Sequence, residues 1–190
     1  MNIVIEIRRW DYEINIKWLY GLLMLGLLTS STNAFNITDG IDGLLSGISI
    51  IMGLGFMYIA YSQNEVSILY MLICVNVIVF IFWCFNIPKA NLFMGDTGSL
   101  SLGAVMGVIA ILTHREITLV VVAGVFVIET LSVIIQTVSM VLFKKKVFLM
   151  TPLHHHFEMS GWSEDKIVMI FSLVALVGCF IALLPLIFNF

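Results

Sequence analysis

Charged residues are scarce in this chain of 190 residues. They make up 11% of the sequence, whereas hydrophobic residues make up 61% and the mean hydropathy is +1.09. A soluble domain carries about 25% charged residues, so this composition excludes an ordinary soluble protein. The net charge of -3 and the lack of a basic stripe argue against nucleic-acid binding. The composition therefore predicts an integral membrane protein, and no nucleic-acid partner.

Several common site patterns are also missing. The three cysteines lie inside apolar runs and form no C-x-x-C pair, which argues against a disulfide framework or a cysteine-based zinc site. No P-loop occurs, and no glutamate closes a 12-residue EF-hand loop. No apolar stretch typical of a signal peptide follows the start of the chain. Residues 1–17 instead alternate apolar and polar side chains, which predicts a short strand or hairpin at the membrane surface.

Long apolar runs fill the remainder, residues 18–190. A spanning helix needs about 20 apolar residues. The candidate spans are Trp18–Ala34, Leu44–Tyr61, Val66–Phe85, Leu100–Thr113, Ile117–Phe143 and Ile167–Phe188. The fourth can cross only if it extends into the preceding loop or if the bilayer thins there, and the fifth is long enough to tilt or kink. The sequence thus predicts an all-α, polytopic helical membrane protein of about six transmembrane helices, forming one domain after an external segment.

The loops alternate in length. Those after the first, third and fifth spans are long and polar, and the other loops are short. The long loops carry five lysines, Lys89, Lys144, Lys145, Lys146 and Lys166. The positive-inside rule places the long loops in the cytoplasm of a bacterial inner membrane, and residues 1–17 outside. A chain that begins in an external loop of a larger protein would explain an external start, and we take this as a hypothesis.

The first long loop, Asn33-Ala-Phe-Asn-Ile-Thr-Asp-Gly-Ile-Asp-Gly-Leu44, is acidic. Asp39 and Asp42 are three residues apart and would share one face of a helical turn. Asn33 and Asn36 add amide groups. This pattern favours a site for a divalent cation or a nucleotide, although Asp39 could instead cap the second helix.

The second long loop runs from Asn86 to Leu100 and ends in Gly95-Asp96-Thr97-Gly98-Ser99. A carboxylate beside the amino end of a helix suits Mg²⁺ and phosphate together. Asp96 as a plain helix cap is the structural alternative. Phe93 could stack on a base or could belong to the core.

The third long loop contains three consecutive histidines, His154, His155 and His156. Adjacent side chains rarely all point at one metal ion, so phosphate or substrate binding is favoured over a zinc site.

Glu129 and Gln136 lie seven residues apart in the fifth span, on one face. An ionisable group inside a membrane helix indicates a functional site.

These three loops, in this order, resemble the cytoplasmic motifs of a known enzyme family. The chain is similar to the C-terminal half of the phospho-N-acetylmuramoyl-pentapeptide transferases, within the polyprenyl-phosphate N-acetylhexosamine-1-phosphate transferase superfamily (glycosyltransferase family 4). The string Pro152-Leu-His-His-His-Phe-Glu158 favours the muramoyl branch over relatives that transfer GlcNAc-1-phosphate. The resemblance covers nearly the whole chain.

The resemblance implies Mg²⁺-dependent transfer of phospho-MurNAc-pentapeptide from UDP-MurNAc-pentapeptide to undecaprenyl phosphate, which yields lipid I and UMP in peptidoglycan synthesis. It implies a homodimer in contact with membrane lipids. Catalytic roles fall on Asp39, Asp96 and His155, with Asp96 and Asp39 as the metal ligands. The substrate-binding residues would be Asn33, Asn36, Asp42, Asn86, Phe93, Gly95, Gln136, His154 and His156.

One family motif is missing. The family carries an adjacent aspartate pair in its N-terminal half, and no Asp-Asp occurs in this chain. The chain could be a fragment that needs a separate N-terminal half, the product of a split gene, or a non-catalytic membrane protein that still binds nucleotide or lipid. A metal-ion transporter is a weaker alternative, because only Glu129 of the acidic candidates lies at membrane depth.

Overall fold

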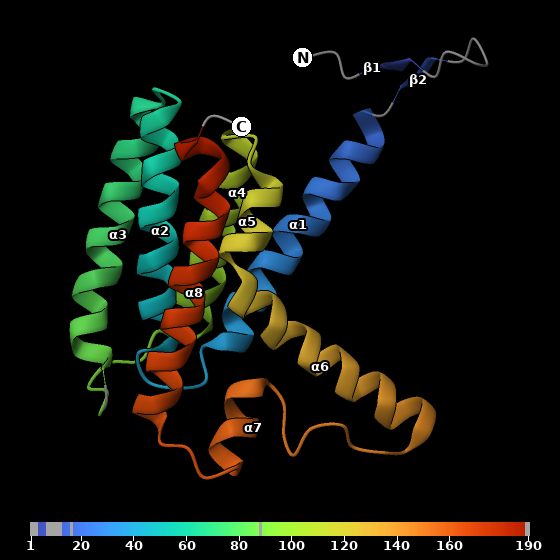
Figure 1. The fold of residues 1–190 in the computed structure, drawn as a ribbon, viewed down its shortest axis with the longest axis vertical. Coiled ribbons are helices and arrows are strands. Elements are labelled where there is room, and N and C mark those ends of the chain that lie inside the picture. Colours follow the sequence, from blue (N-terminus) through green and yellow to red (C-terminus); the bar gives the residue numbers. More distant parts are fainter. Residues whose placement is uncertain (1–3, 7–12, 16, 88, 189–190) are drawn as a thin grey trace.

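Helices dominate the computed structural model, which describes residues 4–6, 13–15, 17–87 and 89–188 (Figure 1). Two short strands precede them, β1 (Val4–Glu6) and β2 (Glu13–Asn15), paired antiparallel with Ile5 opposite Ile14. The helices are α1 (Lys17–Thr38), α2 (Leu44–Ser62), α3 (Val66–Asn86), α4 (Gly95–Leu112), α5 (Glu116–Val122), α6 (Gly124–Phe143), α7 (Leu153–Met159) and α8 (Glu164–Ile187). The other residues of the segment 1–17 lie outside the described part, and its external location stays a prediction.

Five of these helices, α2, α3, α4, α6 and α8, are long and apolar enough to cross a membrane. This confirms the prediction of a polytopic helical membrane protein. The first predicted span forms α1, which has 22 residues. It is less apolar than the five because its carboxyl-terminal third begins with the polar run Thr29-Ser-Ser-Thr-Asn33.

The fourth and fifth predicted spans differ from simple helices. The fourth does extend into the preceding loop, since α4 begins at Gly95. The fifth is interrupted at Ala123 and forms the short α5 and the longer α6, which leans away from the bundle (Figure 1). The sequence did not predict α7, a single short helix that carries all three consecutive histidines.

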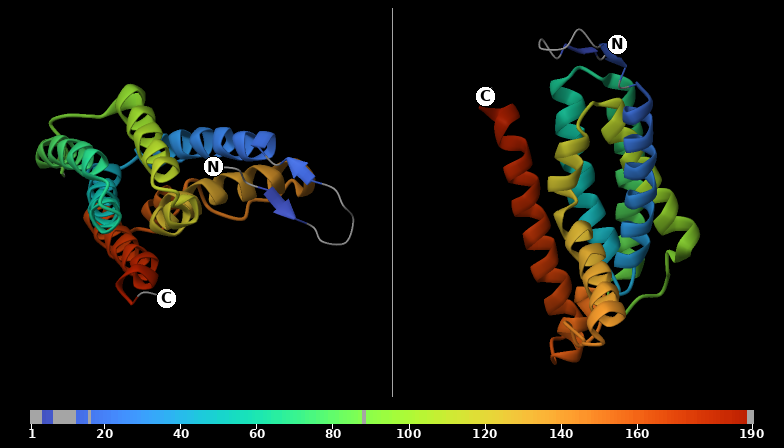
Figure 2. Two further views of the ribbon diagram at one scale, coloured as in Figure 1. Left: turned by 90° about the horizontal axis from the view of Figure 1, so that it is seen from above. Right: turned by 90° about the vertical axis from the view of Figure 1, so that its right-hand side faces the viewer.

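The three long connections gather at one end of the bundle, as the loop lengths predicted (Figure 1). The turns between α2 and α3 and between α4 and α5 lie at the opposite end. Helix α2 is the most buried of the five spans, and it contacts both α3 and α8. Seen from above, α1 and α6 run side by side on the other flank of the molecule (Figure 2). The polar loops are therefore held together by a helical frame.

Helices α1 and α4 approach each other closely through a glycine. A Cβ atom at Gly103 would lie 2.7 Å from the backbone oxygen of Ser31 and 2.8 Å from the Cα of Thr32. The Ser31 hydroxyl donates a hydrogen bond of 2.7 Å to the Gly103 carbonyl. Small residues allow such backbone approach between membrane helices. This contact fixes the distance between the helices that carry Asn36 and Asp96.

We expect Gly103→Ala to lower the free energy of unfolding in detergent by about 1–3 kcal/mol, because the added methyl group overpacks the contact. The added methyl group meets backbone atoms on α1, so the two helices must separate. Gly26→Ala in α1 is the matched control, because a Cβ there meets nothing within 4 Å. Both substitutions raise helix propensity by about the same amount. Equal melting temperatures for the two variants would contradict the prediction.

Candidate active site

A pocket of about 270 Å³ lies where the first two long loops meet. Three helix ends surround it: the carboxyl ends of α1 and α3 and the amino end of α4. Its lining residues are Asn36, Asp39, Gly40, Ile41, Asp42, Asn86, Phe93, Met94, Gly95 and Asp96. Seven of the residues singled out in the sequence therefore line one pocket, although they are up to sixty positions apart in the chain.

One wall of the pocket is a polar contact between α1 and α4. The Asn36 amide donates to the Asp96 carboxylate at 3.0 Å and to the Ser99 hydroxyl at 3.0 Å. Asp96 lies in the first turn of α4 and is exposed. A carboxylate there is stabilised by the helix dipole. Asn36 thus orients Asp96 toward the pocket while leaving its second oxygen available to a ligand.

Asn86 connects the two loops through hydrogen bonds of its side chain. Its side-chain oxygen accepts hydrogen bonds from the Gly43 backbone N–H and the Ser46 hydroxyl, both at 3.0 Å, and its amide donates to the Leu92 carbonyl at 3.0 Å. The residue is 5% exposed. Because its oxygen and one of its two N–H donors are used within the protein, Asn86 holds the pocket walls together.

Replacing Asn86 by alanine should therefore destabilise the protein and weaken ligand binding. Three hydrogen bonds disappear, and buried donors and acceptors are left without partners at a cost of about 1–3 kcal/mol each. Melting in detergent measures the effect, and the exposed Asn91 provides the matched Asn→Ala control. A melting temperature of Asn86→Ala equal to that of Asn91→Ala would rule out this clamping role.

The remaining polar groups of the two loops face one another across the pocket. The Asp42 carboxylate accepts a hydrogen bond of 2.9 Å from the Ala90 backbone N–H. Positive φ angles at Gly43 (78°) and Gly95 (64°) turn the chain into α2 and α4, a conformation that glycine adopts without strain. The Phe93 side chain is 73% exposed. It is therefore a rim residue with a free aromatic face, not part of the core.

Asp39 has an unusual acidity. Its burial, and secondarily the nearby negative charge of Asp96, raise the pKa of the Asp39 carboxyl from 3.8 to about 6. Burial disfavours the charged form of an acid, and a second carboxylate adds to the effect. Two carboxyl groups that repel each other at neutral pH form a strong site for a cation that neutralises both.

The donors present fit magnesium bound together with a phosphate ligand. Among the described residues, no group of three or more His, Cys, Asp or Glu side chains is placed to hold a metal ion. Mg²⁺ does not require one, because it keeps several waters and is usually bound by one or two carboxylates plus substrate phosphates. Asp39 and Asp96 supply two such carboxylates, beside the amino end of α4.

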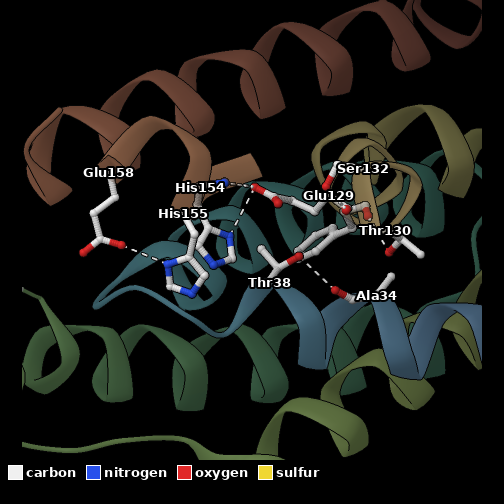
Figure 3. Close-up of polar contacts among 9 residues, drawn as sticks. Ala34, Thr38, Glu129, Thr130, Ser132, His154, His155 and Glu158 are labelled. Carbon is white, nitrogen blue, oxygen red and sulfur yellow. Dashed lines mark hydrogen bonds and ion pairs between the residues drawn. The ribbon is translucent and has the colours of Figure 1, made fainter. Parts of the chain in front are cut away.

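The three histidines of α7 have different partners, and Figure 3 shows His154 beside Glu129 and His155 beside Glu158. His154 is fully buried next to Glu129. The Nδ1 atom of His155 lies 2.9 Å from the Oε2 atom of Glu158. His156 accepts a hydrogen bond of 3.1 Å from the Leu149 backbone N–H. The histidines therefore form no common metal site, and none is among the residues that line the pocket.

Two other predicted substrate contacts lie away from the pocket. The Asn33 amide donates to the Thr29 carbonyl within α1, at 2.7 Å. The Gln136 side chain accepts from the backbone N–H groups of Val147 and Phe148 and donates to the Phe148 carbonyl. Gln136 thus ties the chain after α6 back onto that helix, which places α7.

Two further contributions escaped the sequence analysis. Ser99 receives the Asn36 amide, and its position three residues after Asp96, one helical turn along, was the available signal. Gly40 lies directly against the His154 ring, so that a Cβ atom there would overlap Nε2. No sequence pattern connects Gly40 with His154, because the two residues lie more than a hundred positions apart in the chain.

A comparison with known protein families accounts for this arrangement. The family model described as glycosyl transferase family 4 matches residues 3–114, more than half of the chain. The chain belongs to this family. The matched region includes all ten pocket-lining residues, so the family assignment and the pocket rest on the same part of the sequence.

Individual relatives extend the similarity past the histidines. The chain is 46% identical over 166 residues to the phospho-N-acetylmuramoyl-pentapeptide-transferase of Geobacillus thermodenitrificans, covering 87% of this chain and 51% of that protein. It is 45% identical over 181 residues to the transferase of that name from Bacillus subtilis, covering 93% and 56%. The chain thus spans about half the length of the curated relatives it matches.

Proposed function

We propose that this chain transfers phospho-MurNAc-pentapeptide from UDP-MurNAc-pentapeptide to undecaprenyl phosphate, forming lipid I and UMP. The observation that carries the proposal is the pairing of Asp39 and Asp96 across a pocket at the loop end of a membrane bundle. The names of the relatives give the transferred group, and the resemblance to the family supplies the nucleotide donor and the lipid acceptor. The pocket supplies groups suited to a diphosphate, and the rim aromatic Phe93 can stack on a base.

The residues of the chain would divide the work as follows. Asp96, oriented by Asn36, and Asp39 would hold Mg²⁺, which when bound neutralises charge on the phosphate oxygens. Phosphoryl transfer depends chiefly on positioning and charge stabilisation. The Asn86 clamp keeps both loops at a fixed separation. His155, partly exposed beside Glu158, would be available to the sugar or phosphate of the donor.

A second pocket offers room for the acceptor lipid. It measures about 420 Å³ and is lined by side chains of α1, α5 and α6, most of them apolar. The ring of Phe35 stacks on Phe126 at its wall, with centroids 4.1 Å apart. Phe35 immediately precedes Asn36 in α1, so the two pockets are lined by neighbouring residues of the same helix. A polyprenyl chain in the apolar pocket would bring its phosphate toward the polar one.

The proposal also fixes topology and assembly. The loop end would face the cytoplasm of the bacterial inner membrane, because the donor nucleotide is made there and because the long loops carry the lysines. We expect the protein to act as a homodimer, as the resemblance implies.

The decisive experiment incubates the purified full chain in lipid nanodiscs with labelled UDP-MurNAc-pentapeptide, undecaprenyl phosphate and Mg²⁺. Formation of lipid I with release of UMP, abolished by EDTA, supports the proposal. Saturable binding of the nucleotide without product would instead favour a non-catalytic binding protein, the alternative raised by the missing aspartate pair. If neither binding nor product is detected, both functions are excluded for this chain.

A further inference from the structure

A buried acid and a buried histidine form a pair beneath the active-site pocket. Glu129 of α6 and His154 of α7 are each fully buried, and Figure 3 shows their side chains next to each other. One Glu129 carboxyl oxygen, Oε1, accepts a hydrogen bond of 3.1 Å from the His154 backbone N–H and lies 3.3 Å from the Nδ1 atom of the ring. Glu129 therefore holds His154 both by its backbone and by its side chain.

The backbone contact meets a need of α7 itself. The first N–H groups of a helix have no partner within it, and Pro152, the residue before α7, makes no side-chain cap. Glu129 supplies an acceptor for His154 from another helix. Its removal would leave that N–H buried without a partner, so α7 depends on α6 for its position.

The far side of the His154 ring contacts the first acidic loop. The ring lies so close to Gly40 that a Cβ there would overlap Nε2. Gly40 directly follows Asp39 and lines the pocket. The ring also contacts that of His155, with centroids 4.3 Å apart. His154 is thus the link between Glu129 and two residues of the proposed site.

The chemistry of the pair selects one form of the histidine. A carboxyl oxygen beside Nδ1 favours a proton on that nitrogen, which leaves the lone pair on Nε2 directed at Gly40. In the described part of the chain, neither nitrogen of the His154 ring forms a hydrogen bond, nor does the second Glu129 oxygen, so Nδ1 and Glu129 Oε1 are in close polar contact without a formed hydrogen bond. Buried polar atoms without partners are costly and rare. Three of the six such side-chain atoms in the described part of the chain belong to this one pair of residues.

We propose that Glu129 is a positioning residue: through His154 it fixes the Asp39–Gly40 turn and the ring of His155. The effect on the ring and the loop is independent of any substrate. Its consequence for nucleotide binding rests on the proposed function. Glu129 acts without touching a ligand, since neither it nor His154 lines the pocket.

The first test measures the ring and the loop without ligand. The full chain is labelled with ¹⁵N at histidine rings and at glycine, and the signals of His154 and Gly40 are assigned with His154→Gln and Gly40→Ala. In the wild type we expect the tautomer protonated at Nδ1. Glu129→Gln, whose amide oxygen can still accept the hydrogen bond from the His154 backbone N–H and lie beside Nδ1, should retain the ring and Gly40 signals. Glu129→Leu, which fills the space without an acceptor, should shift both sets.

The second test measures affinity for UMP in the same variants. We expect Glu129→Leu to bind about 10- to 100-fold more weakly, the range found when a group that orients a ligating residue is lost, and Glu129→Gln to bind nearly as well as the wild type. Glu65→Gln, an exposed acid at the opposite end of the bundle, is the control and should bind normally.

The outcomes separate this proposal from the proposed function. If Glu129→Leu leaves the His154 tautomer and the Gly40 signal unchanged, the positioning role is wrong. Should that variant fail to fold, Gly40→Ala tests the same contact from the other side, because its methyl group must displace the ring. An unchanged His154 signal in Gly40→Ala would likewise overturn the proposal. A wild-type chain that binds no UMP would contradict the proposed function, while the ring and loop signals would still decide the role of Glu129.

Discussion

Asp96→Asn should reduce lipid I formation by about 100- to 1,000-fold, the loss typical of removing one charge-stabilising group from an active site. The substitution keeps the size of the side chain, and its amide oxygen can still accept the hydrogen bond from Asn36. What disappears is the negative charge that faces Asp39 across the pocket. Because the pocket walls remain in place, nucleotide binding should fall less than turnover.

The control for this variant is Asp165→Asn. Asp165 also lies in the first turn of a long helix, α8, and is exposed, yet it does not line the pocket. It should leave turnover unchanged. Circular dichroism and gel filtration in detergent check that both variants remain folded. Near-normal turnover of Asp96→Asn would remove Asp96 from any role in holding the metal.

Affinity for a divalent cation should fall about tenfold between pH 7 and pH 5, because only about a tenth of a carboxyl group is ionised one pH unit below its pKa. The pKa of Asp39 is raised to about 6 by burial and by the charge of Asp96. An ordinary aspartate, with a pKa of 3.8, would stay ionised over this interval. Electron paramagnetic resonance of Mn²⁺ with the full chain measures the affinity directly.

Asp39→Asn gives this prediction two opposite signatures. Cation affinity should be weak at both pH values and lose its dependence on pH. Without cation, however, the variant should melt at a higher temperature than the wild type at pH 7. A raised pKa in the folded state favours folding at low pH, and that stabilisation is lost as the pH rises through about 6. Asparagine avoids the loss. An unchanged pH dependence of cation affinity in Asp39→Asn would assign the titration to another group.

The sequence predicted the frame of the molecule well because membrane helices follow a simple rule. A run of apolar residues long enough to cross the bilayer is helical, since backbone groups must be satisfied internally. The alternation of long and short loops then placed the polar motifs at one end. Asp39, Asp42 and Asp96 were singled out because glycines lie beside them in the sequence, and in the folded protein all three line the pocket.

What the sequence could not provide was the direction of each side chain. The three histidines looked alike in the chain, yet α7 turns each by about 100° from the next. As a result His154 is buried while His155 meets Glu158. Asn86 and Gln136 were assigned to substrate binding on the resemblance to the family. In the folded protein nearby backbone groups occupy both of them.

The break at Ala123 was equally hidden. Nothing in the run from Ile117 to Phe143 marks an end, since no proline occurs within it and Gly124 alone is a weak signal. The interruption arises where α5 packs on α8 and α6 turns toward α1. Tertiary packing thus decides a boundary that local composition leaves open.

The apolar pocket between α1, α5 and α6 has a consequence for how reaction rates must be measured. Half-exposed side chains such as Val120 and Leu131 stand at its border, so an acceptor lipid would enter sideways from the bilayer while the nucleotide enters from water. The relevant concentration of the lipid is then its mole fraction in the membrane. Adding inert phospholipid should slow the reaction at constant total acceptor, and adding water should not.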